Sequence, residues 1–393
     1  MPALNAYLGC VLTDIKSLIR EELEAQFKTW EQPVYRVTQL LEWLYVRDAT
    51  SWDAMTNLPK KLRAQLVENY SLQSLELVRK QGSRDITQKF LWKLADGAFI
   101  ESVLIPANPA LYGEASDRHT LCVSTQVGCA YGCKFCASGL DGWKRNLAPN
   151  EIVEQVLAIE RWNESEAKAE SQKSNKTNAT PPPPGATPDT RLINNLVIMG
   201  MGEPLANYEN LLKALRILNA PWGGGIGARK ITISTSGLVP QIRRLADEPE
   251  QFRLAISLHG ATDVVRQRIM PVNRKYPLKE LTAALEYYQG QKDRMITFEY
   301  ILIAGVNDAI EQTQPLGMLA RHLRAKVNLI PYNSVEGLQW QRPSDEVCED
   351  FLDALEKQRI PATLRREKGH DIDAACGQLR LKTERELSES KPA

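Results

Sequence analysis

Apolar residues in the first 70 positions recur every three or four places, which is the spacing of amphipathic helices. Thr13 and Asp14 can cap a helix through residues 15–27, because short polar side chains there accept hydrogen bonds from the first free amides. Residues 39–46 and 58–70 repeat the helical spacing. The pattern predicts a helical N-terminal domain over residues 1–70.

The segment that follows is rich in the residue types of β-strands. Residues 72–80 and 87–106 form two such runs, and Asp96-Gly97 interrupts the second. An Asp-Gly pair between two apolar runs is typical of a tight hairpin turn. We therefore expect a β-rich connector over residues 71–119 that contains a hairpin.

From residue 120 onward, short apolar runs alternate with helical patterns. Six runs have the length of strands: 121–125, 195–200, 230–235, 253–258, 297–303 and 326–331. Helical spacing lies between several of them, at 150–162, 207–218 and 278–290. Such alternation indicates a parallel sheet in an α/β fold. Six units favour a partial, TIM-like barrel over a closed barrel of eight units, so we expect this core over 120–380 and a tail over 381–393.

Residues 163–190 differ from both neighbouring segments. They contain no Val, Ile, Leu, Met or aromatic residue and include four consecutive prolines. A segment of this composition cannot bury a core. We expect a disordered surface insertion between the first crossover helix and the second strand of the core.

Composition narrows the possible partners. The 393 residues are 43% hydrophobic and 25% charged, and their net charge of +1 gives no overall attraction to nucleic acid or membrane. The sequence has neither a membrane-spanning apolar stretch nor a secretion signal, so we expect a cytoplasmic protein. RNA binding would need local basic groups, of which the candidates are Lys60, Lys61, Arg63, Lys144, Arg145, Arg243, Arg244, Arg365, Arg366 and Lys368.

Three of the seven cysteines form a C-x3-C-x2-C motif at Cys129, Cys133 and Cys136. Thiolates are soft ligands that favour iron–sulfur clusters, zinc or copper. A cubane cluster usually takes four cysteines, so three would leave one iron open to a small molecule. Zinc is the alternative, although it needs a fourth ligand and His119 lies ten residues upstream. The preceding strand would place this motif at the carboxyl end of the sheet.

Several motifs occur in a characteristic order around these cysteines. They are ESVLIP at 101–106, TLCVSTQVGC at 120–129, GWKRNLAPNEIVEQV at 142–156, MGMGEPLANY at 199–208, ISTSGLVP at 233–240, SLHG at 257–260, LIPYN at 329–333 and DIDAACGQL at 371–379. Together they resemble the radical S-adenosylmethionine (SAM) superfamily, and within it the dual-specificity RNA methyltransferases that make 2-methyladenosine. The resemblance implies a [4Fe-4S] cluster on the three cysteines and SAM as the second cofactor.

The resemblance also assigns a set of polar positions at strand ends to SAM binding. Judged from the residues alone, a glycine-rich turn or a serine at a strand end is usually only a turn, and a histidine there is usually a structural hydrogen-bond donor. The cofactor-binding residues that the resemblance implies are Gly202, Glu203, Ser234, Ser257, Leu258, His259 and Asn333.

Two further cysteines and one glutamate gain roles from the same resemblance. Cys376 matches the methyl-carrying cysteine, Cys122 its disulfide-forming partner, and Glu101 the proton acceptor. Two SAM molecules would be used for each methyl group that reaches C2 of adenine. From the residues alone, the two cysteines are small buried side chains and the glutamate is a solvated one.

The family's substrates and partners complete the expectation. They are an adenosine of 23S rRNA at the peptidyl transferase centre, adenosine 37 of tRNA, and a flavodoxin- or ferredoxin-type electron donor; we expect a monomer that does not bind membranes. Three alternatives stay open: a relative that methylates C8 of adenine, a radical enzyme that activates another protein through a glycyl radical, and a non-enzymatic zinc or electron-transfer module.

Overall fold

The computed structural model describes residues 12–82, 86–107, 117–173, 191–365 and 378–389, without the side chains of 170–173 and 387–389. The chain forms two compact units that alternate along the sequence. Unit 1 comprises residues 1–74, 148–189 and 213–225, and unit 2 comprises residues 75–147, 190–212 and 226–393. The four-part division expected from the sequence stays a prediction.

Unit 1 is helical, as the apolar spacing predicts. It contains α1 (Arg20–Thr29), α2 (Tyr35–Tyr45), α3 (Lys60–Asn69), α5 (Pro149–Lys173) and the short 3-10 helices η1 (Ile15–Ser17) and η2 (Trp52–Ala54). Its buried apolar residues include Leu23, Phe27, Leu40, Leu44, Leu62 and Leu66. Such side chains at helical spacing on each helix supply the core of this unit.

The first predicted helix begins later than expected. Asp14 does act as a cap, since its side chain accepts a hydrogen bond of 2.9 Å from the Lys16 amide. That cap, however, begins only η1, because Leu18 and Ile19 are extended and the α-helix starts at Arg20. The amide of Gln73 also donates to Asp14, so the Asp14 side chain links the start of this unit to the segment that follows α3.

The prediction of disorder over residues 163–190 is wrong for the first part of that segment, because α5 extends into it. The helix continues through residues 163–173, within the segment expected to be disordered. Residues 164–169 are exposed, and Lys168 pairs with Glu164 one turn away at 3.5 Å. Glu, Ala and Lys are strong helix formers, so an exposed helix needs no apolar face here. The rest of the segment, 174–190, lies outside the described residues.

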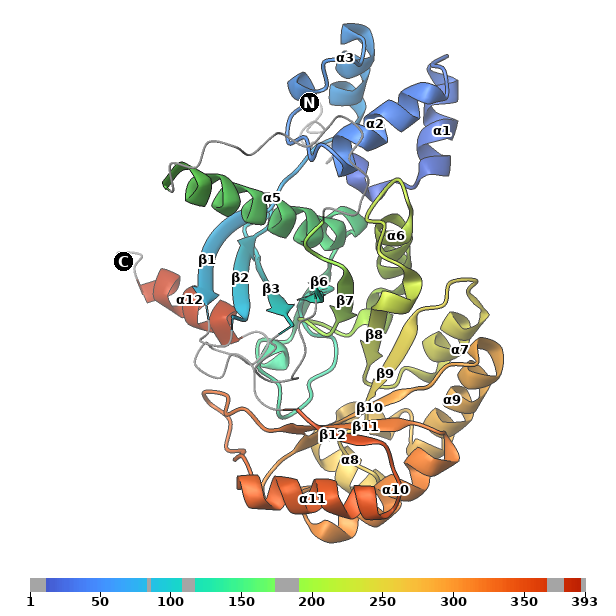
Figure 1. Cartoon of the computed structure of the whole chain (residues 1–393), viewed down its shortest axis with the longest axis vertical. Coiled ribbons are helices and arrows are strands. Elements are labelled where there is room, and N and C mark those ends of the chain that lie inside the picture. The colour runs from blue at the N-terminus through green and yellow to red at the C-terminus, as the bar shows by residue number, and fades with distance from the viewer. Residues whose placement is uncertain (1–11, 83–85, 108–116, 174–190, 366–377, 390–393) are drawn as a thin grey trace, which may run out of the picture. The chain divides into compact units, whose positions relative to one another are not determined.

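Unit 2 is built on one ten-stranded sheet with the order β1-β2-β3-β4-β7-β8-β9-β10-β11-β12 (Figure 1). Its first three strands, β1 (Glu76–Gly82), β2 (Gln88–Lys93) and β3 (Phe99–Pro106), are antiparallel. The predicted hairpin is confirmed: Gly97 adopts a φ of +83°, and the Asp96 carboxylate accepts a hydrogen bond from the Ala98 amide.

The six predicted strands of the core are all present and run parallel. They are β4 (His119–Cys122), β7 (Asn195–Ile198), β8 (Ile231–Thr235), β9 (Arg253–Ser257), β10 (Thr297–Leu302) and β11 (Lys326–Pro331). A short seventh parallel strand, β12 (Ala362–Leu364), was not predicted. Strands β1 and β12 end the sheet without pairing to each other, so the barrel is open and the predicted fold class is confirmed.

Helices cover the outer side of the parallel strands, as Figure 1 shows for α7, α9, α10 and α11. The helices of this part are α7 (Val239–Asp247), α8 (Asp263–Ile269), α9 (Leu278–Lys292), α10 (Thr313–His322) and α11 (Asp345–Lys357). Helix α6 (Tyr208–Asn219) follows β7, and α12 (Gln378–Glu389) begins before residue 381, where the tail was predicted to start. The carboxyl ends of the strands are thus left for loops that carry polar residues.

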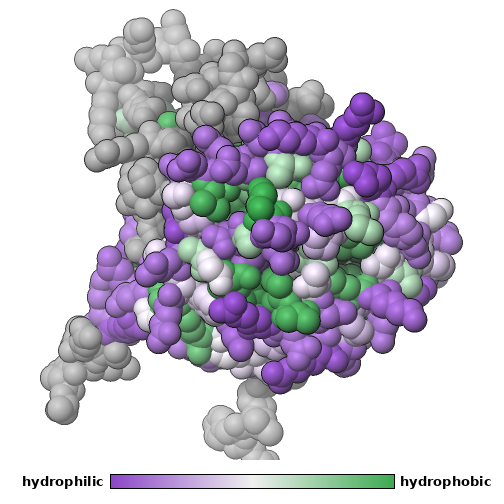
Figure 2. Space-filling model, turned by 90° about the horizontal axis from the view of Figure 1, so that it is seen from below, coloured by the Kyte–Doolittle hydropathy of each residue, from purple (hydrophilic) through white to green (hydrophobic). Residues whose placement is uncertain are grey.

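The surface of the molecule carries both apolar and hydrophilic residues. Figure 2 shows one face of the molecule, on which apolar residues occur in groups bounded by hydrophilic ones. Among the described helices, none combines the length and the apolar character that crossing a bilayer requires.

Candidate active site

The three cysteines lie on a closed loop, here called the cysteine loop (residues 129–142). A two-stranded ribbon of β5 (Gln126–Gly128) and β6 (Trp143–Asn146) brackets it. The Cys129 amide donates to the Gly142 carbonyl at 3.1 Å, which closes the loop. Gly128 has a φ of +77°, and a Cβ there would lie 2.0 Å from that carbonyl, so only glycine fits where the loop begins.

A second set of contacts fixes the middle of the cysteine loop. The Lys134 amide donates to the Ile269 carbonyl at 2.9 Å, and the Trp340 indole donates to the Lys134 carbonyl at 2.7 Å. The Cys136 amide donates to the Cys133 carbonyl at 3.1 Å. Two segments that are distant in sequence therefore both hold the loop at Lys134.

Gln126 joins the cysteine loop to the Gly-Glu turn after β7. Its Oε1 accepts hydrogen bonds from the amides of Ala130, at 3.1 Å, and Glu203, at 2.9 Å. Its Nε2 donates to Asn146 at 2.8 Å. One buried side chain therefore sets the spacing between the thiols and the turn that the resemblance assigns to SAM.

The three thiols open into one cavity of about 300 Å³, here called the cofactor cavity. Six of the seven predicted cofactor-binding residues line it with them: Gly202, Glu203, Ser234, Ser257, His259 and Asn333. The seventh, Leu258, is fully buried and is not part of the lining. The structure therefore brings together, at the carboxyl ends of several strands, residues that are up to 204 positions apart in the sequence.

The thiols fit a polynuclear cluster. They line the cavity wall together, yet within the described part of the chain no three Cys, His, Asp or Glu side chains gather around a single ion. A cubane binds one thiolate at each of several irons, so its ligands need not converge on one point. Burial raises the pKa of Cys129 to about 12 and that of Cys133 well above its usual range, so a bound cation would be required for these groups to be thiolates.

Glu203 is anchored by backbone amides on both sides. One carboxylate oxygen accepts from the Ser236 amide at 2.7 Å, and the other accepts from the Leu205 amide at 3.1 Å. Burial raises the pKa of Glu203, and these amide bonds act in the opposite direction. The carboxylate is 4% exposed and faces the cofactor cavity, where it can accept from a ligand ammonium or hydroxyl.

Gly202 makes the close approach in this turn possible. Its φ is +103°, and a Cβ there would lie 2.6 Å from the Cβ of Gln126. Both the backbone conformation and the packing therefore require glycine. This explains physically why a glycine precedes Glu203.

His259 is a neutral ring in this cavity. Its Nδ1 accepts a hydrogen bond from the Ile301 amide at 3.1 Å, and burial together with Arg266 lowers its pKa to about 3. The proton therefore lies on Nε2. The ring edge also contacts Phe135 of the cysteine loop, at a centroid distance of 4.9 Å. The residue alone predicts a structural hydrogen-bond donor; in the structure Nδ1 is instead an acceptor, because the Ile301 amide points at it.

Sequence reasoning missed two charged residues near the cofactor cavity. Glu299 on β10 is 8% exposed, lines the cavity, and accepts from Asn328 at 2.6 Å. Arg266 is fully buried and donates only to neutral groups: Leu258 O, Ser236 O and Asn273 Oδ1. Leu258 does not line the cavity; its carbonyl accepts a hydrogen bond from the buried Arg266. The available signal was a charged residue inside an otherwise apolar strand, 297–302.

Arg266 also supplies positive charge close to the thiols. Burial lowers its pKa to about 10, while Cys133 and Asp263 act in the opposite direction. In turn, Arg266 opposes the burial that raises the pKa of Cys133. A guanidinium with neutral hydrogen-bond partners can thus offset the negative charge of a thiolate-bound cluster.

Glu101 and Cys122 lie on neighbouring strands away from the lining of the cofactor cavity. Glu101 on β3 is only 2% exposed, so the solvated glutamate expected from the residue alone is not what the structure shows. Its carboxylate pairs with Lys89 at 2.9 Å and accepts from the Arg380 amide at 2.7 Å. Cys122 on β4 is 6% exposed and pairs across strands with Val103.

Cys376 lies outside the described residues, as do Arg366 and Lys368. The described chain resumes at Gln378, two residues after Cys376, where α12 begins. The hydrogen bond from the Arg380 amide to Glu101 therefore fixes the start of α12 beside the predicted proton acceptor.

The candidate RNA-binding cations differ in their surroundings. Arg365 lines the cofactor cavity. Arg145 pairs with Asp96 at 2.7 Å, Arg63 with Asp53 at 3.4 Å, and Arg244 with Glu209. Lys60 and Lys61, at the start of α3, are exposed. These exposed or paired cations stay candidates for phosphate contacts.

Comparison with known proteins gives two family matches. The model of the "Ribosomal RNA large subunit methyltransferase N-terminal domain" matches residues 13–72, and that of the "Radical SAM superfamily" matches residues 190–314. A "Probable dual-specificity RNA methyltransferase RlmN 3" from Opitutus terrae is 53% identical, covering 93% of this chain and 94% of the relative. A "Probable dual-specificity RNA methyltransferase RlmN" from Akkermansia muciniphila is 52% identical, covering 90% and 91%.

A solved structure agrees with these matches. The crystal structure of a radical SAM methyltransferase from Sphaerobacter thermophilus has a TM-score of 0.81 and 42% identity, covering 93% of this chain and 98% of that one. The likeness therefore extends over nearly the whole fold.

Proposed function

Because the chain belongs to the RlmN family of dual-specificity RNA methyltransferases, which are radical SAM enzymes, we propose that it methylates C2 of adenosine in RNA. The proposed substrates are one adenosine of 23S rRNA at the peptidyl transferase centre and adenosine 37 of tRNA. The observation that carries the proposal is the cofactor cavity, in which three thiols and the Gly202-Glu203 turn face the same space.

The family's cofactors are a [4Fe-4S] cluster and SAM. We propose that Cys129, Cys133 and Cys136 hold the cluster and that the polar lining of the cofactor cavity holds SAM. When bound, the two cofactors supply the methyl group and a hydrogen-abstracting radical. The role of the protein is to position the two cofactors, to exclude water and to place a methyl carrier beside the base.

We assign the methyl carrier to Cys376, whose thiolate is the nucleophile that accepts the methyl group. Glu101 is proposed to take the proton that leaves C2, because its pairing with Lys89 supports a buried carboxylate. The Cys122 thiolate then attacks the sulfur of Cys376. This forms a disulfide and breaks the bond between that sulfur and the carbon now attached to C2, and this carbon takes up a proton to become the methyl group of the released base. An external reductant must reopen that disulfide before the next turnover.

Support for these roles comes from two contacts within unit 2. The Arg380 amide binds Glu101, which ties the chain just after Cys376 to β3. Strand β4, which carries Cys122, pairs with β3 as well. Glu101 and Cys122 therefore lie on adjacent strands, and the helix that begins two residues after Cys376 in the sequence is hydrogen-bonded to Glu101.

The remaining partners are proposals that rest on the family. We propose that the N-terminal helices over residues 1–70 dock RNA, which the family match over 13–72 supports. We also propose a cytoplasmic monomer that receives electrons from a flavodoxin- or ferredoxin-type protein. Light scattering after size exclusion tests the monomer, and comparison of purified donors tests the electron source.

The deciding experiment is mass spectrometry of nucleosides. RNA lacking the modification is incubated anaerobically with reconstituted enzyme, SAM and reductant, and its nucleosides are compared with authentic standards. The proposal predicts 2-methyladenosine in both 23S rRNA and tRNA. The alternative is 8-methyladenosine in 23S rRNA, which would assign the chain to the relatives that methylate C8.

A further inference from the structure

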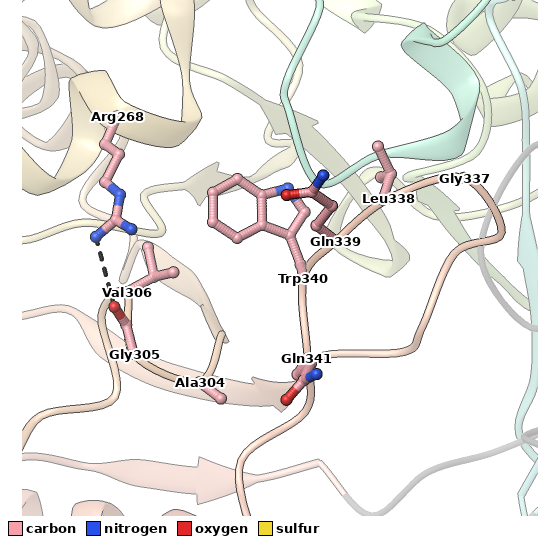
Figure 3. Close-up of a pocket in the computed structure, with 9 residues that line it drawn as sticks. All are labelled: Arg268, Ala304, Gly305, Val306, Gly337, Leu338, Gln339, Trp340 and Gln341. Atoms are coloured by element: carbon pink, nitrogen blue, oxygen red, sulfur yellow. Dashed lines mark hydrogen bonds between the residues drawn. The ribbon is translucent and has the colours of Figure 1, made fainter.

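Unit 2 contains a second hollow, of about 440 Å³, outside the lining of the cofactor cavity. We call it the Trp340 pocket; Figure 3 shows its lining residues, which are Arg268, Ala304, Gly305, Val306, Gly337, Leu338, Gln339, Trp340 and Gln341. They come from the end of α8, the loop after β10 and the loop after β11. The sequence motifs assign none of them a role.

Two flat side chains, those of Arg268 and Trp340, line opposite sides of this hollow. Figure 3 shows the Arg268 guanidinium on one side and the Trp340 indole on the other, and the guanidinium carbon lies 5.9 Å from the indole centroid. A base stacked between two planar groups needs about 7 Å, twice the ~3.4 Å spacing of stacked bases. Arg268 is exposed and has one long hydrogen bond, of 3.4 Å, to the Gly305 carbonyl, so it can move by the remaining distance.

The indole is the fixed half of this pair. Its Nε1 donates to the Lys134 carbonyl at 2.7 Å, which holds the ring by its edge. The Ala304 amide donates to the Gln341 carbonyl at 2.9 Å, and this bond fixes the loop that carries Trp340. A platform that is already oriented loses little conformational freedom when a ligand stacks on it.

The other polar groups suit the edge of a base. The Gln339 and Gln341 side chains are exposed in the lining of this hollow, Gln339 beside the indole and Gln341 farther along the loop, and each amide offers both a donor and an acceptor. Unpaired RNA bases are recognised in this way, by stacking on aromatic rings and guanidinium planes and by hydrogen bonds to their edges.

We propose that the Trp340 pocket binds an unpaired base of the RNA substrate, other than the adenine that is methylated. The base stacks between Arg268 and Trp340, and the two glutamines contact its edge. This inference rests on RNA as the substrate and not on methylation at C2. Because Trp340 is hydrogen-bonded to Lys134, RNA bound here would contact a side chain that holds the segment carrying the thiols.

The first test compares substitutions of Arg268 in the reconstituted holoenzyme. Arg268→Ala removes both the plane and the charge, whereas Arg268→Lys keeps only the charge. From the usual strength of base stacking we expect both variants to bind fluorescein-labelled tRNA transcript about tenfold more weakly, measured by anisotropy without turnover. Arg274→Ala, which removes an exposed cation that does not line the pocket, is the matched control and should stay within about twofold.

Each other result contradicts the stacked base. If Arg268→Lys binds like the wild type, charge alone acts and no base lies on the guanidinium. If neither variant changes the affinity for RNA, the pocket is not an RNA site. A loss of turnover with a protein electron donor but not with dithionite, at unchanged RNA affinity, would assign the pocket to the donor.

A direct contact test avoids any variant that fails to fold. Transcripts containing 4-thiouridine are irradiated on the wild-type holoenzyme, and the cross-linked peptides are mapped. We expect cross-links in residues 337–341, and their suppression when excess unlabelled transcript competes. Cross-links that map only to other segments would overturn the proposal. Because binding alone is measured, the result is independent of which adenine carbon is methylated.

Discussion

The cofactor cavity and the Trp340 pocket lie in the same unit but are built in different ways. Around the cofactor cavity, Glu203 uses both carboxylate oxygens on backbone amides, and Gln126 links two loops through three hydrogen bonds. In the Trp340 pocket, Arg268 has a single long bond to a carbonyl. A small cofactor of constant shape suits a fixed wall, whereas a macromolecular substrate suits side chains that can adjust.

The largest expected effect comes from removing one of the three thiols that line the cofactor cavity. Cys133→Ala should give anaerobically reconstituted protein with little bound iron and no 5′-deoxyadenosine, because a cubane held by only two protein thiolates is not retained. Cys348→Ala is the matched control, since Cys348 is buried in α11 away from the cysteine loop. Iron analysis and product chromatography measure both. Full iron content in Cys133→Ala would remove that residue from the ligand set.

A second prediction concerns Glu101, which lies outside the cavity lining. Glu101→Gln removes the proton acceptor while keeping an oxygen for the Arg380 amide, so we expect methylation to fall by roughly 10²–10⁴-fold. Cofactor cleavage without RNA should continue. The measurement is single-turnover methylation of tRNA beside the yield of 5′-deoxyadenosine.

Loss of the ion pair with Lys89 must be separated from loss of the base. Glu101→Gln leaves the buried Lys89 ammonium without its carboxylate, which destabilises a protein by about 3–5 kcal/mol. The double variant with Lys89→Met removes that unpaired charge. If the double variant regains wild-type methylation, Glu101 is structural and not the proton acceptor.

A third prediction tests how closely the Gly-Glu turn must approach Gln126. Gly202→Ala places a methyl group 2.6 Å from the Gln126 Cβ at a φ of +103°. We expect SAM affinity to fall about 10- to 100-fold, from strain of about 1–3 kcal/mol. Gly97→Ala is the control, because Gly97 also has a positive φ but nothing lies within 4 Å of its added methyl group. Equal SAM affinity of the two variants, measured by calorimetry, would contradict the claim that the Gly202–Gln126 contact sets the shape of the cofactor cavity.

The smallest effect is a pH dependence at His259. Its pKa of about 3 lies below the ~6.5 of the unfolded chain, so between these values the unfolded chain binds a proton that the folded protein does not. This group therefore lowers the free energy of unfolding as pH falls, by about 1.4 kcal/mol per pH unit. His259→Gln removes the term, so denaturant unfolding of wild type and variant should differ less at pH 5 than at pH 6. If the free energies of unfolding of wild type and variant instead differed by the same amount at both pH values, the His259 ring would be protonated in the folded protein.

The sequence predicted the parts of this molecule whose signal is local. Six strands were found because each is a short apolar run, and the cysteine loop because three thiols occur within eight residues. The strand-end residues that line the cofactor cavity were predicted from a family resemblance, since a serine at a strand end carries no signal of its own. The hairpin at Asp96-Gly97 was predicted because its turn chemistry is specific.

The parts that were missed depend on contacts between distant segments. Strand β12 has only three residues and none is fully buried, so it exists because β11 offers a free edge. The continuation of α5 lacks the apolar periodicity on which the prediction relied. Arg266 and Trp340 look like surface residues in the sequence, and only the fold shows that one is buried behind the cofactor cavity and the other holds the cysteine loop.

The central claim is that Cys376 carries the methyl group through a hydrogen-abstraction step, and isotopic labelling tests it most directly. Enzyme, reductant and RNA are incubated anaerobically over several turnovers with SAM whose methyl group is fully deuterated. The account predicts 2-methyladenosine that retains two of the three deuterium atoms and 5′-deoxyadenosine that carries the third. Product that retains all three, with unlabelled 5′-deoxyadenosine, would show direct methyl displacement and contradict the account.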